Sequence, residues 1–395
     1  MRIILYTGKG GVGKTSIAAV SACKLAKDGK KVLIMSTDAA HSLGDSFDVK
    51  LSREPQKVVD YPNAGKVDAM EIDVVYESEQ TWKNMQDYMK KMLTSRGEGG
   101  IEAEELLVFP GMEELFSLFK ILDFYQSGEE NTYDVIIVDC APTGETLSLL
   151  KYPEMLSDFM EKILPMKRKG LKVAGPAVEK MMKIPMPDES FFDDLELVMK
   201  KMEDLQNLLL NKEVVSLRIV TTPEKIVIKE AKRNFTCLHL YNYNVDAIMV
   251  NRIYPQKAME GYFSKWIEMQ KEGIQEIEES FSEVPKFYLE LQDKELRTLP
   301  VLEEIAEKLY GETDPVNVLF NHEIFHLTEE EDVSVLNIYL PFAEKDELDL
   351  RQTENELLIG VKNERRSYSL AKRLQDKSIK GAVFEDGYLK VKFQA

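Results

Sequence analysis

The chain has 395 residues, of which 44% are apolar, and it carries a formal net charge of −18. This length is enough for two or three domains, and the apolar fraction suffices for a large core. The acidic balance argues against nucleic acid and anionic membrane surfaces as general partners. No apolar run reaches the roughly 18 residues of a membrane span, and no secretory leader is recognisable. We therefore expect a soluble, cytoplasmic protein.

The first fifteen residues, MRIILYTGKGGVGKT, predict a strand, a glycine-rich loop and the start of a helix. They complete the phosphate-binding pattern G-x-x-x-x-G-K-T, in which backbone N–H groups and the helix N-terminus bind phosphate oxygens. Lys14 would supply charge to the β- and γ-phosphates, and the Thr15 hydroxyl suits Mg²⁺. The candidate nucleotide-binding residues of this loop are Gly8, Lys9, Gly10, Gly11, Val12, Gly13, Lys14, Thr15 and Ser16.

A second lysine, Lys9, directly follows the first glycine of the loop. Holding one nucleotide within one chain does not require it. One interpretation is a solvated loop lysine. The other rests on a resemblance to the deviant P-loop ATPases, in which this lysine crosses a dimer interface to the phosphates of the partner and so takes part in catalysis.

The first candidate switch segment follows a buried strand predicted over 31–37. Asp38 lies at the carboxyl end of this strand, beside the ligand crevice of a doubly wound sheet. It could orient or deprotonate the attacking water, or it could simply cap a turn. His41 and Ser42 follow; they either sense the γ-phosphate or only pack near the site.

A second strand that ends in an acid is predicted over 135–139. Asp139 at its end would hold hydrated Mg²⁺ as a Walker-B acid does. The next residues, Pro142, Thr143 and Gly144, predict a turn that moves with the γ-phosphate. Between the two switch segments we expect a strand over 66–73 and helices over 77–94 and 102–125, broken by a flexible stretch at 95–100 and by a Pro-Gly pair.

Residues 151–212 contain eight of the 18 methionines, interleaved with Leu, Ile and Phe. Methionine adapts to varied apolar partners, so this stretch predicts a client-binding surface; a helical core that uses Met as filler is the alternative. The candidate groove residues are Met155, Met160, Met181, Met182 and Met186.

The parallel fold resumes at 217–225, which predicts a strand followed by a helix that starts at a proline, and with a buried strand predicted over 245–255. Asn251 lies near the end of the second strand, where its amide could bond an adenine edge or serve as a turn residue. A helix over 257–279, a strand over 284–291 and a helix over 299–310 complete the pattern.

At the level of these motifs the chain resembles the ArsA-type ATPases, which include the arsenite pump-driving ATPase and the targeting factor for tail-anchored membrane proteins. The matching stretches are GKGGVGKT (8–15), STDAAHSLGDSF (36–47), PGMEE (110–114), DCAPTGETLSLL (139–150), VTTPEK (220–225) and VNRIYP (250–255). The resemblance implies an ATP-driven homodimer with Lys9 acting in trans, Asp38 on the hydrolytic water and Asp139 in the second switch. It also implies Asn251 at adenine and a helical subdomain at 151–212 that presents an apolar groove.

After a predicted linker at 313–332, short strands separated by turn signals predict a small all-β sandwich over 333–395. The strands are expected at 333–342, 347–353, 356–362, 365–371 and 388–393. This pattern resembles the α-crystallin domain that some ArsA relatives have at this end. It is either an interaction module or a stabilising appendage.

The sequence therefore predicts an α/β ATPase domain over 1–312, with a doubly wound, mainly parallel sheet of the deviant P-loop type and a helical insertion. We expect a Mg²⁺-dependent homodimer in which ATP governs binding of a hydrophobic protein segment. The first alternative is an ATPase that energises arsenite efflux with a membrane subunit. Against it, Cys23, Cys140 and Cys237 are scattered and form no C-x-x-C. The second is a regulatory switch like MinD or ParA, although no C-terminal amphipathic helix is predicted.

Overall fold

A computed structural model describes most of the chain. It covers residues 1–37, 42–73, 76–78, 81, 83–84, 87, 112–127, 133–141, 189–259, 264–330, 333–353, 355–362 and 364–394. Several predicted site residues lie outside these ranges. They are Asp38, His41, Pro142, Thr143, Gly144, Met155, Met160, Met181, Met182 and Met186.

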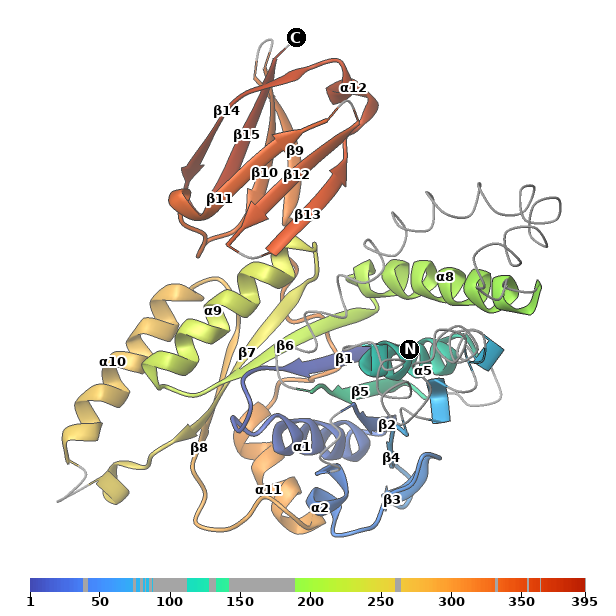
Figure 1. The fold of residues 1–395 in the computed structure, drawn as a ribbon. Helices are drawn as coiled ribbons and strands as arrows, with labels where there is room; N and C mark the ends of the chain where they lie inside the picture. Colours follow the sequence, from blue (N-terminus) through green and yellow to red (C-terminus); the bar gives the residue numbers. More distant parts are fainter. Residues whose placement is uncertain are drawn as a thin grey trace, which may run out of the picture.

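An eight-stranded sheet forms the centre of the larger domain (Figure 1). Its order is β3-β4-β2-β5-β1-β6-β7-β8, and all neighbours are parallel except β3 and β4. The strands are β1 (Arg2–Thr7), β2 (Lys31–Ser36), β3 (Gln56–Asp60), β4 (Lys66–Glu71), β5 (Val135–Asp139), β6 (Val215–Thr221), β7 (Val245–Ile253) and β8 (Lys286–Glu290). The predicted mainly parallel α/β sheet is confirmed.

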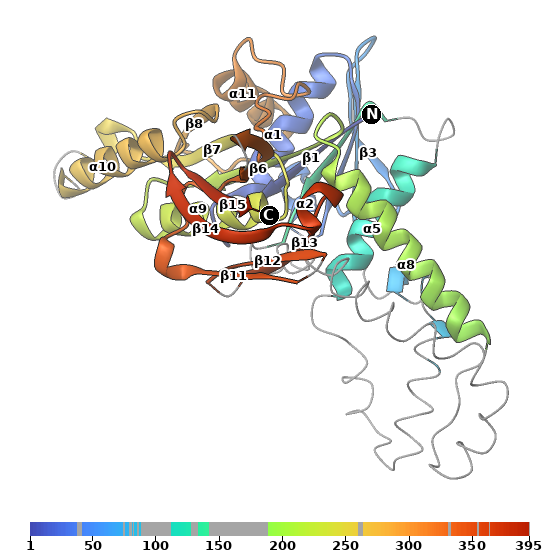
Figure 2. The ribbon, with the colours of Figure 1, turned by 90° about the horizontal axis from the view of Figure 1, so that it is seen from above.

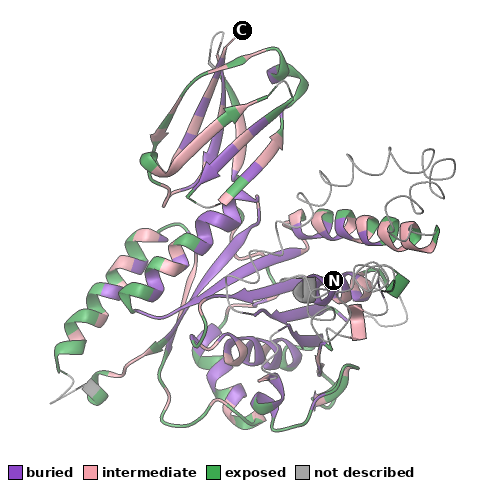
Figure 3. Cartoon of the chain, in the orientation of Figure 1, coloured by how far each residue is buried: buried purple, intermediate pink, exposed green. Residues whose placement is uncertain are grey.

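Helices cover both faces of this sheet, because its central strands are apolar on both sides (Figures 2 and 3). In β1, Ile3 and Leu5 belong to one core, whereas Ile4 and Tyr6 belong to the other. One face is packed by α1 (Lys14–Lys27), α2 (Leu43–Phe47) and α11 (Leu299–Tyr310). The other is packed by α5 (Met112–Gln126), α8 (Glu189–Leu210), α9 (Lys225–Leu240) and α10 (Ser264–Ser280), which follows the short helix η2 (Gln256–Met259).

The C-terminal strands form two antiparallel sheets, as predicted. Their orders are β14-β15-β10-β9 and β11-β12-β13. The elements are β9 (Phe325–Glu330), β10 (Val333–Tyr339), η4 (Lys345–Glu347), β11 (Leu348–Gln352), β12 (Glu356–Val361), β13 (Glu364–Ser369), α12 (Lys372–Gln375), β14 (Ser378–Glu385) and β15 (Tyr388–Gln394). Two strands differ from the prediction: β14 was not expected, and β9 lies within the range predicted as a linker and pairs with β10.

The rest of the predicted linker, residues 313–324, is held against the ATPase domain by backbone contacts. The Arg2 Nε donates to the Val316 carbonyl at 3.0 Å, and the Asn244 amide donates to the Phe320 carbonyl at 2.8 Å. Ile324 is fully buried. Segment 313–324 therefore has no helix or strand but is fixed in place.

The sandwich packs on the C-terminal end of α9 (Figure 1). Arg366 donates from Nη1 to the Leu240 carbonyl at 2.9 Å, and the Tyr241 hydroxyl donates to the Arg365 carbonyl at 3.0 Å. A guanidinium at a helix C-terminus complements the helix dipole. The Phe235 and Phe342 rings meet edge-on across this junction, 5.6 Å apart. The two domains thus share one apolar core.

Only the last part of the methionine-rich region, α8, lies within the described chain. It packs along α5 (Figure 2) and buries Met202 in the sheet-facing core. Leu197 on the same helix is 45% exposed. For Met202 the core interpretation therefore holds. None of the helices described is long and apolar enough to cross a membrane.

Candidate nucleotide site

The glycine-rich loop lies at the carboxyl ends of the parallel strands, between β1 and α1. From β1 the chain passes through α1 to β2 on one side, and β6, β7 and β8 are added on the other. This reversal of strand order is where doubly wound sheets bind ligands. The α1 N-terminus also begins here, so its free N–H groups and positive dipole end face the loop.

Two loop glycines are required because neighbouring atoms approach them closely. A Cβ on Gly8 would lie 2.3 Å from the Val220 carbonyl oxygen, and one on Gly13 would lie 2.4 Å from the side-chain amide nitrogen of Asn251. Gly13 also has a φ of +92°, which disfavours other residues. Without Cβ atoms at these positions the loop can follow its close path beside β6 and β7.

Three oxygen-bearing side chains from distant parts of the sequence meet beside the loop. The Thr15 hydroxyl donates to the Asp139 carboxylate at 2.6 Å and lies 3.3 Å from the Ser42 hydroxyl. Asp139 is fully buried. Hard oxygen donors gathered next to a phosphate loop are the ligands that Mg²⁺ prefers, so these residues fit the ion.

The ends of β2 and β5 are tied together at the starts of the two switch segments. The Thr37 N–H donates to the Asp139 carbonyl at 3.0 Å, and the Ala141 N–H donates to the Thr37 hydroxyl at 3.0 Å. Thr37 precedes Asp38, and Ala141 precedes Pro142. Sequence analysis missed Thr37, because a threonine at a strand end has no distinguishing pattern. These bonds join the two strand ends from which the predicted switch segments follow.

Lys14 lies at the start of α1 with only 6% of its surface exposed, and its ammonium is 3.5 Å from the Lys9 carbonyl. Burial raises the pKa of the Cys140 thiol to about 12 and the Asp139 charge acts in the same direction, whereas the Lys14 charge opposes both.

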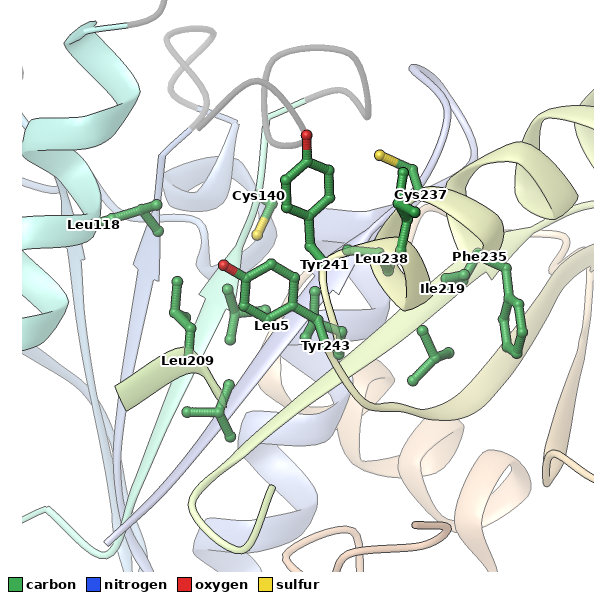
Figure 4. Packing of buried hydrophobic residues seen from close by; sticks show 14 of the residues in the cluster. Leu5, Leu118, Cys140, Leu209, Ile219, Phe235, Cys237, Leu238, Tyr241 and Tyr243 are labelled. Carbon is green, nitrogen blue, oxygen red and sulfur yellow. The ribbon is translucent and has the colours of Figure 1, made fainter. Parts of the chain in front are cut away.

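The three cysteines lie apart and do not form a soft-metal site. Cys23 belongs to the core that contains α1, whereas Cys140, directly after β5, and Cys237, on α9, belong to the opposite core (Figure 4). Burial also raises the pKa of Cys23 to about 12. Among the residues described, no three His, Cys, Asp or Glu side chains gather as metal ligands.

Lys9 forms an ion pair with a residue of α9 within its own chain. Its ammonium contacts the Glu230 carboxylate on α9 at 2.8 Å, and the two side chains are 37% and 33% exposed. Within the described structure, Lys9 thus has a different environment from buried Lys14.

The Asn251 side chain is hydrogen-bonded to the glycine-rich loop. Its Nδ2 donates to the Val12 carbonyl at 2.8 Å, its Oδ1 accepts from the Arg252 N–H at 2.8 Å, and the residue is 5% exposed. Both ends of the amide are engaged within the chain. Adenine contact through Asn251 stays a prediction, and the structure assigns it a role in holding the loop.

A cleft of about 740 Å³ opens beside the loop, within the size range of small-molecule sites. Its far wall is the segment after β8, which sequence analysis missed. The Thr298 N–H of that segment donates to the Ser46 carbonyl on α2 at 3.3 Å. Residues lining the cleft include Gly10, Gly11, Gly13, Lys14, Thr15, Ser42, Asn251, Arg252, Gln292 and Arg297.

Comparison with known proteins assigns this arrangement to a family. The family described as "Anion-transporting ATPase" matches residues 1–311, and one described as "HSP20-like domain found in ArsA" matches residues 331–393. The chain belongs to the ArsA-type anion-transporting ATPases. It is an ATPase: it binds nucleotide and hydrolyses ATP.

Some relatives are named for arsenical pumps, and others carry the name GET3. The chain is 36% identical to "Putative arsenical pump-driving ATPase 1" of Aquifex aeolicus, over 95% of this chain and 96% of that protein. It is 35% identical to "Putative arsenical pump-driving ATPase" of Chlorobaculum tepidum, over 100% of this chain and 96% of that one. It is 30% identical to "ATPase GET3C" of Arabidopsis thaliana, over 78% and 81% of the two chains. All three names include ATPase, but they do not agree on what the enzyme acts on.

Proposed function

We propose that this ArsA-type ATPase works as a Mg²⁺-dependent homodimer in which each Lys9 acts on the nucleotide of the partner chain. The observation that supports this most directly is the difference between the two loop lysines. Lys14 lies buried at the start of α1, while Lys9 is partly exposed and contacts α9 at 2.8 Å. A partly exposed second loop lysine can reach another chain once it leaves this contact.

The residues of the site divide the work. Loop amides and Lys14 would bind the phosphates, and Thr15 and Asp139 would hold Mg²⁺, Asp139 through water. The ion, when bound, neutralises charge on the β- and γ-phosphates. Asp38 would orient the attacking water, and the segments after Thr37 and Ala141 would respond to the γ-phosphate. The hydrogen bonds between Thr37, Ala141 and Asp139 support such coupling.

The output of this cycle, in our proposal, is binding of a hydrophobic protein segment by the region 151–212. The support is the methionine-rich composition of this region and the partly exposed α8 that ends it, with Leu197 45% exposed. Relatives named GET3 and ASNA1 homologue are consistent with this class. ATP can control client binding only if the client has different affinities for the two nucleotide states. The client must therefore bind one nucleotide state more tightly than the other.

Arsenite transport is the second candidate, because the relatives from Aquifex and Chlorobaculum are named for it. Arsenite would need convergent thiolates. The separation of the cysteines and the high pKa of Cys23 and Cys140 argue against such a site.

Peptide binding tests the proposed output. We expect an apolar helical peptide to bind more tightly to the ATP-trapped Asp38→Asn protein than to the nucleotide-free form, by about five-fold or more, a usual size for allosteric coupling. Replacing Met181, Met182 and Met186 together by Ser should weaken that binding and leave ATP affinity unchanged. Fluorescence anisotropy of a labelled peptide measures both effects.

Met269→Ser is the matched control, because Met269 lies on α10 and is 52% exposed. It should leave peptide binding unchanged. Equal peptide affinity in both nucleotide states would remove the client proposal. Arsenite-stimulated turnover without peptide binding would favour the transport alternative.

A further inference from the structure

The contact between Lys9 and Glu230 joins the phosphate loop to α9 across 221 residues of sequence. The ammonium and the carboxylate are 2.8 Å apart. If Lys9 acts on the partner chain, it must leave this contact, because one ammonium cannot remain at α9 and also reach phosphates in another protomer. The contact and the trans function are therefore mutually exclusive states of one side chain.

We propose that Glu230 is a positioning residue that holds Lys9 within its own chain until the nucleotide-loaded dimer closes. This inference rests on the proposed function, in which Lys9 acts in trans. The partial exposure of both partners, 37% and 33%, makes the ion pair weak. A weak pair suits this role. It favours the position of Lys9 at α9, and the negative charges of a triphosphate can still draw Lys9 away from Glu230.

The expected change in concentration dependence follows from the fraction of chains in which Lys9 is not bound to Glu230. When only a fraction of the chains has Lys9 free, the apparent dissociation constant of the active dimer rises by the inverse of that fraction. A partly exposed ion pair shifts such an equilibrium by about two- to five-fold. Removing the carboxylate should therefore lower the protein concentration needed for half-maximal activity by about that factor.

The same helix connects Glu230 to the C-terminal sandwich. Glu230 lines a cleft of about 820 Å³ between α9 and the sandwich, together with Arg233, Phe342 and Glu364. The end of α9 is bonded to the sandwich through the Leu240 carbonyl and Arg366 at 2.9 Å. The helix that carries Glu230 is therefore also the helix on which the sandwich packs.

The test measures ATPase turnover per chain as a function of protein concentration. Glu230→Gln should lower the half-saturating concentration about two- to five-fold relative to wild type, and Glu230→Asp should restore much of the wild-type value. The matched control is Glu272→Gln, which breaks the ion pair between Lys225 of α9 and Glu272 of α10, 2.9 Å long and exposed. It should leave the concentration dependence unchanged.

A Lys9→Ala background separates this role from a structural one. Without Lys9 there is nothing to hold, so adding Glu230→Gln should no longer shift the concentration at which the ATP-loaded dimer forms, which sedimentation measures without any need for turnover. If Glu230→Gln behaves as Glu272→Gln does while Lys9→Ala loses turnover, the holding role of Glu230 is wrong and the trans function stands. If Lys9→Ala retains wild-type turnover, both proposals are wrong.

Discussion

Replacing Lys14 by alanine is expected to reduce ATP turnover by about 10³-fold or more, the scale of losing a cation that stabilises transferring phosphoryl charge. Lys14 is nearly buried at the first position of α1, and its charge already acts on Cys140 at the end of β5. Without it the triphosphate would lose the buried cation of the loop, while the Asp139 carboxylate beside Thr15 stays negative. Nucleotide binding should fall with turnover, as steady-state kinetics and binding of a fluorescent ATP analogue would measure.

Lys24→Ala supplies the control for this prediction. Lys24 lies in the last turn of the same helix and pairs with Asp28 at 2.9 Å, far from the loop. Its removal takes one positive charge from α1 and should leave turnover near the wild-type value. A Lys14→Ala protein with turnover within about ten-fold of wild type would contradict the assignment of the loop.

Replacing Asp246 by leucine should destabilise the protein by about 3–5 kcal/mol, since it leaves the buried Arg218 charge without its counter-ion. Both residues are fully buried, and Nε of Arg218 lies 3.0 Å from the Asp246 carboxylate. Arg218 also donates to the Tyr6 hydroxyl at 3.1 Å and to the Pro315 carbonyl at 2.8 Å. The pair thus ties β6 and β7 to β1 and to segment 313–324. Urea denaturation measures the loss.

Replacing both partners distinguishes the unpaired charge from lost packing. Arg218→Met combined with Asp246→Leu should recover much of the stability, because no buried charge remains. Asp60→Asn, which removes an exposed ion pair with Lys57, should leave the unfolding transition unchanged. An Asp246→Leu protein within about 1 kcal/mol of wild type would show that the network contributes little.

Sequence patterns predicted the elements of the nucleotide domain well, because its buried strands are short apolar runs that end in turn or acidic residues. The strand that ends at Asp139 is one case. Thr15, Ser42 and Asp139 were each expected near the phosphate, since all three follow parallel strands, and the structure brings them together. Periodicity and strand ends are local properties, and they are sufficient here.

Other features depend on contacts between distant residues and have no local signal. Glu230 resembles any solvated glutamate of an amphipathic helix, and its contact with Lys9 arises only from the packing of α9. Asn251 lies near the end of β7, where an adenine-binding residue was expected, yet its amide donates to the Val12 carbonyl. Strands β9 and β14 were missed because charged and glycine residues interrupt their alternation.

The most direct test of the account mixes two inactive variants, Lys9→Ala and Lys14→Ala, with separate affinity tags that report heterodimer formation. In a heterodimer, the Lys9→Ala chain still binds ATP through its own Lys14 and receives Lys9 from the other chain. Random pairing in a symmetric dimer gives half heterodimers with one working site each, so turnover should recover to about one quarter of wild type. If both lysines act within one chain, no site in the mixture is complete. Heterodimers that form and show no recovery would contradict the trans role of Lys9.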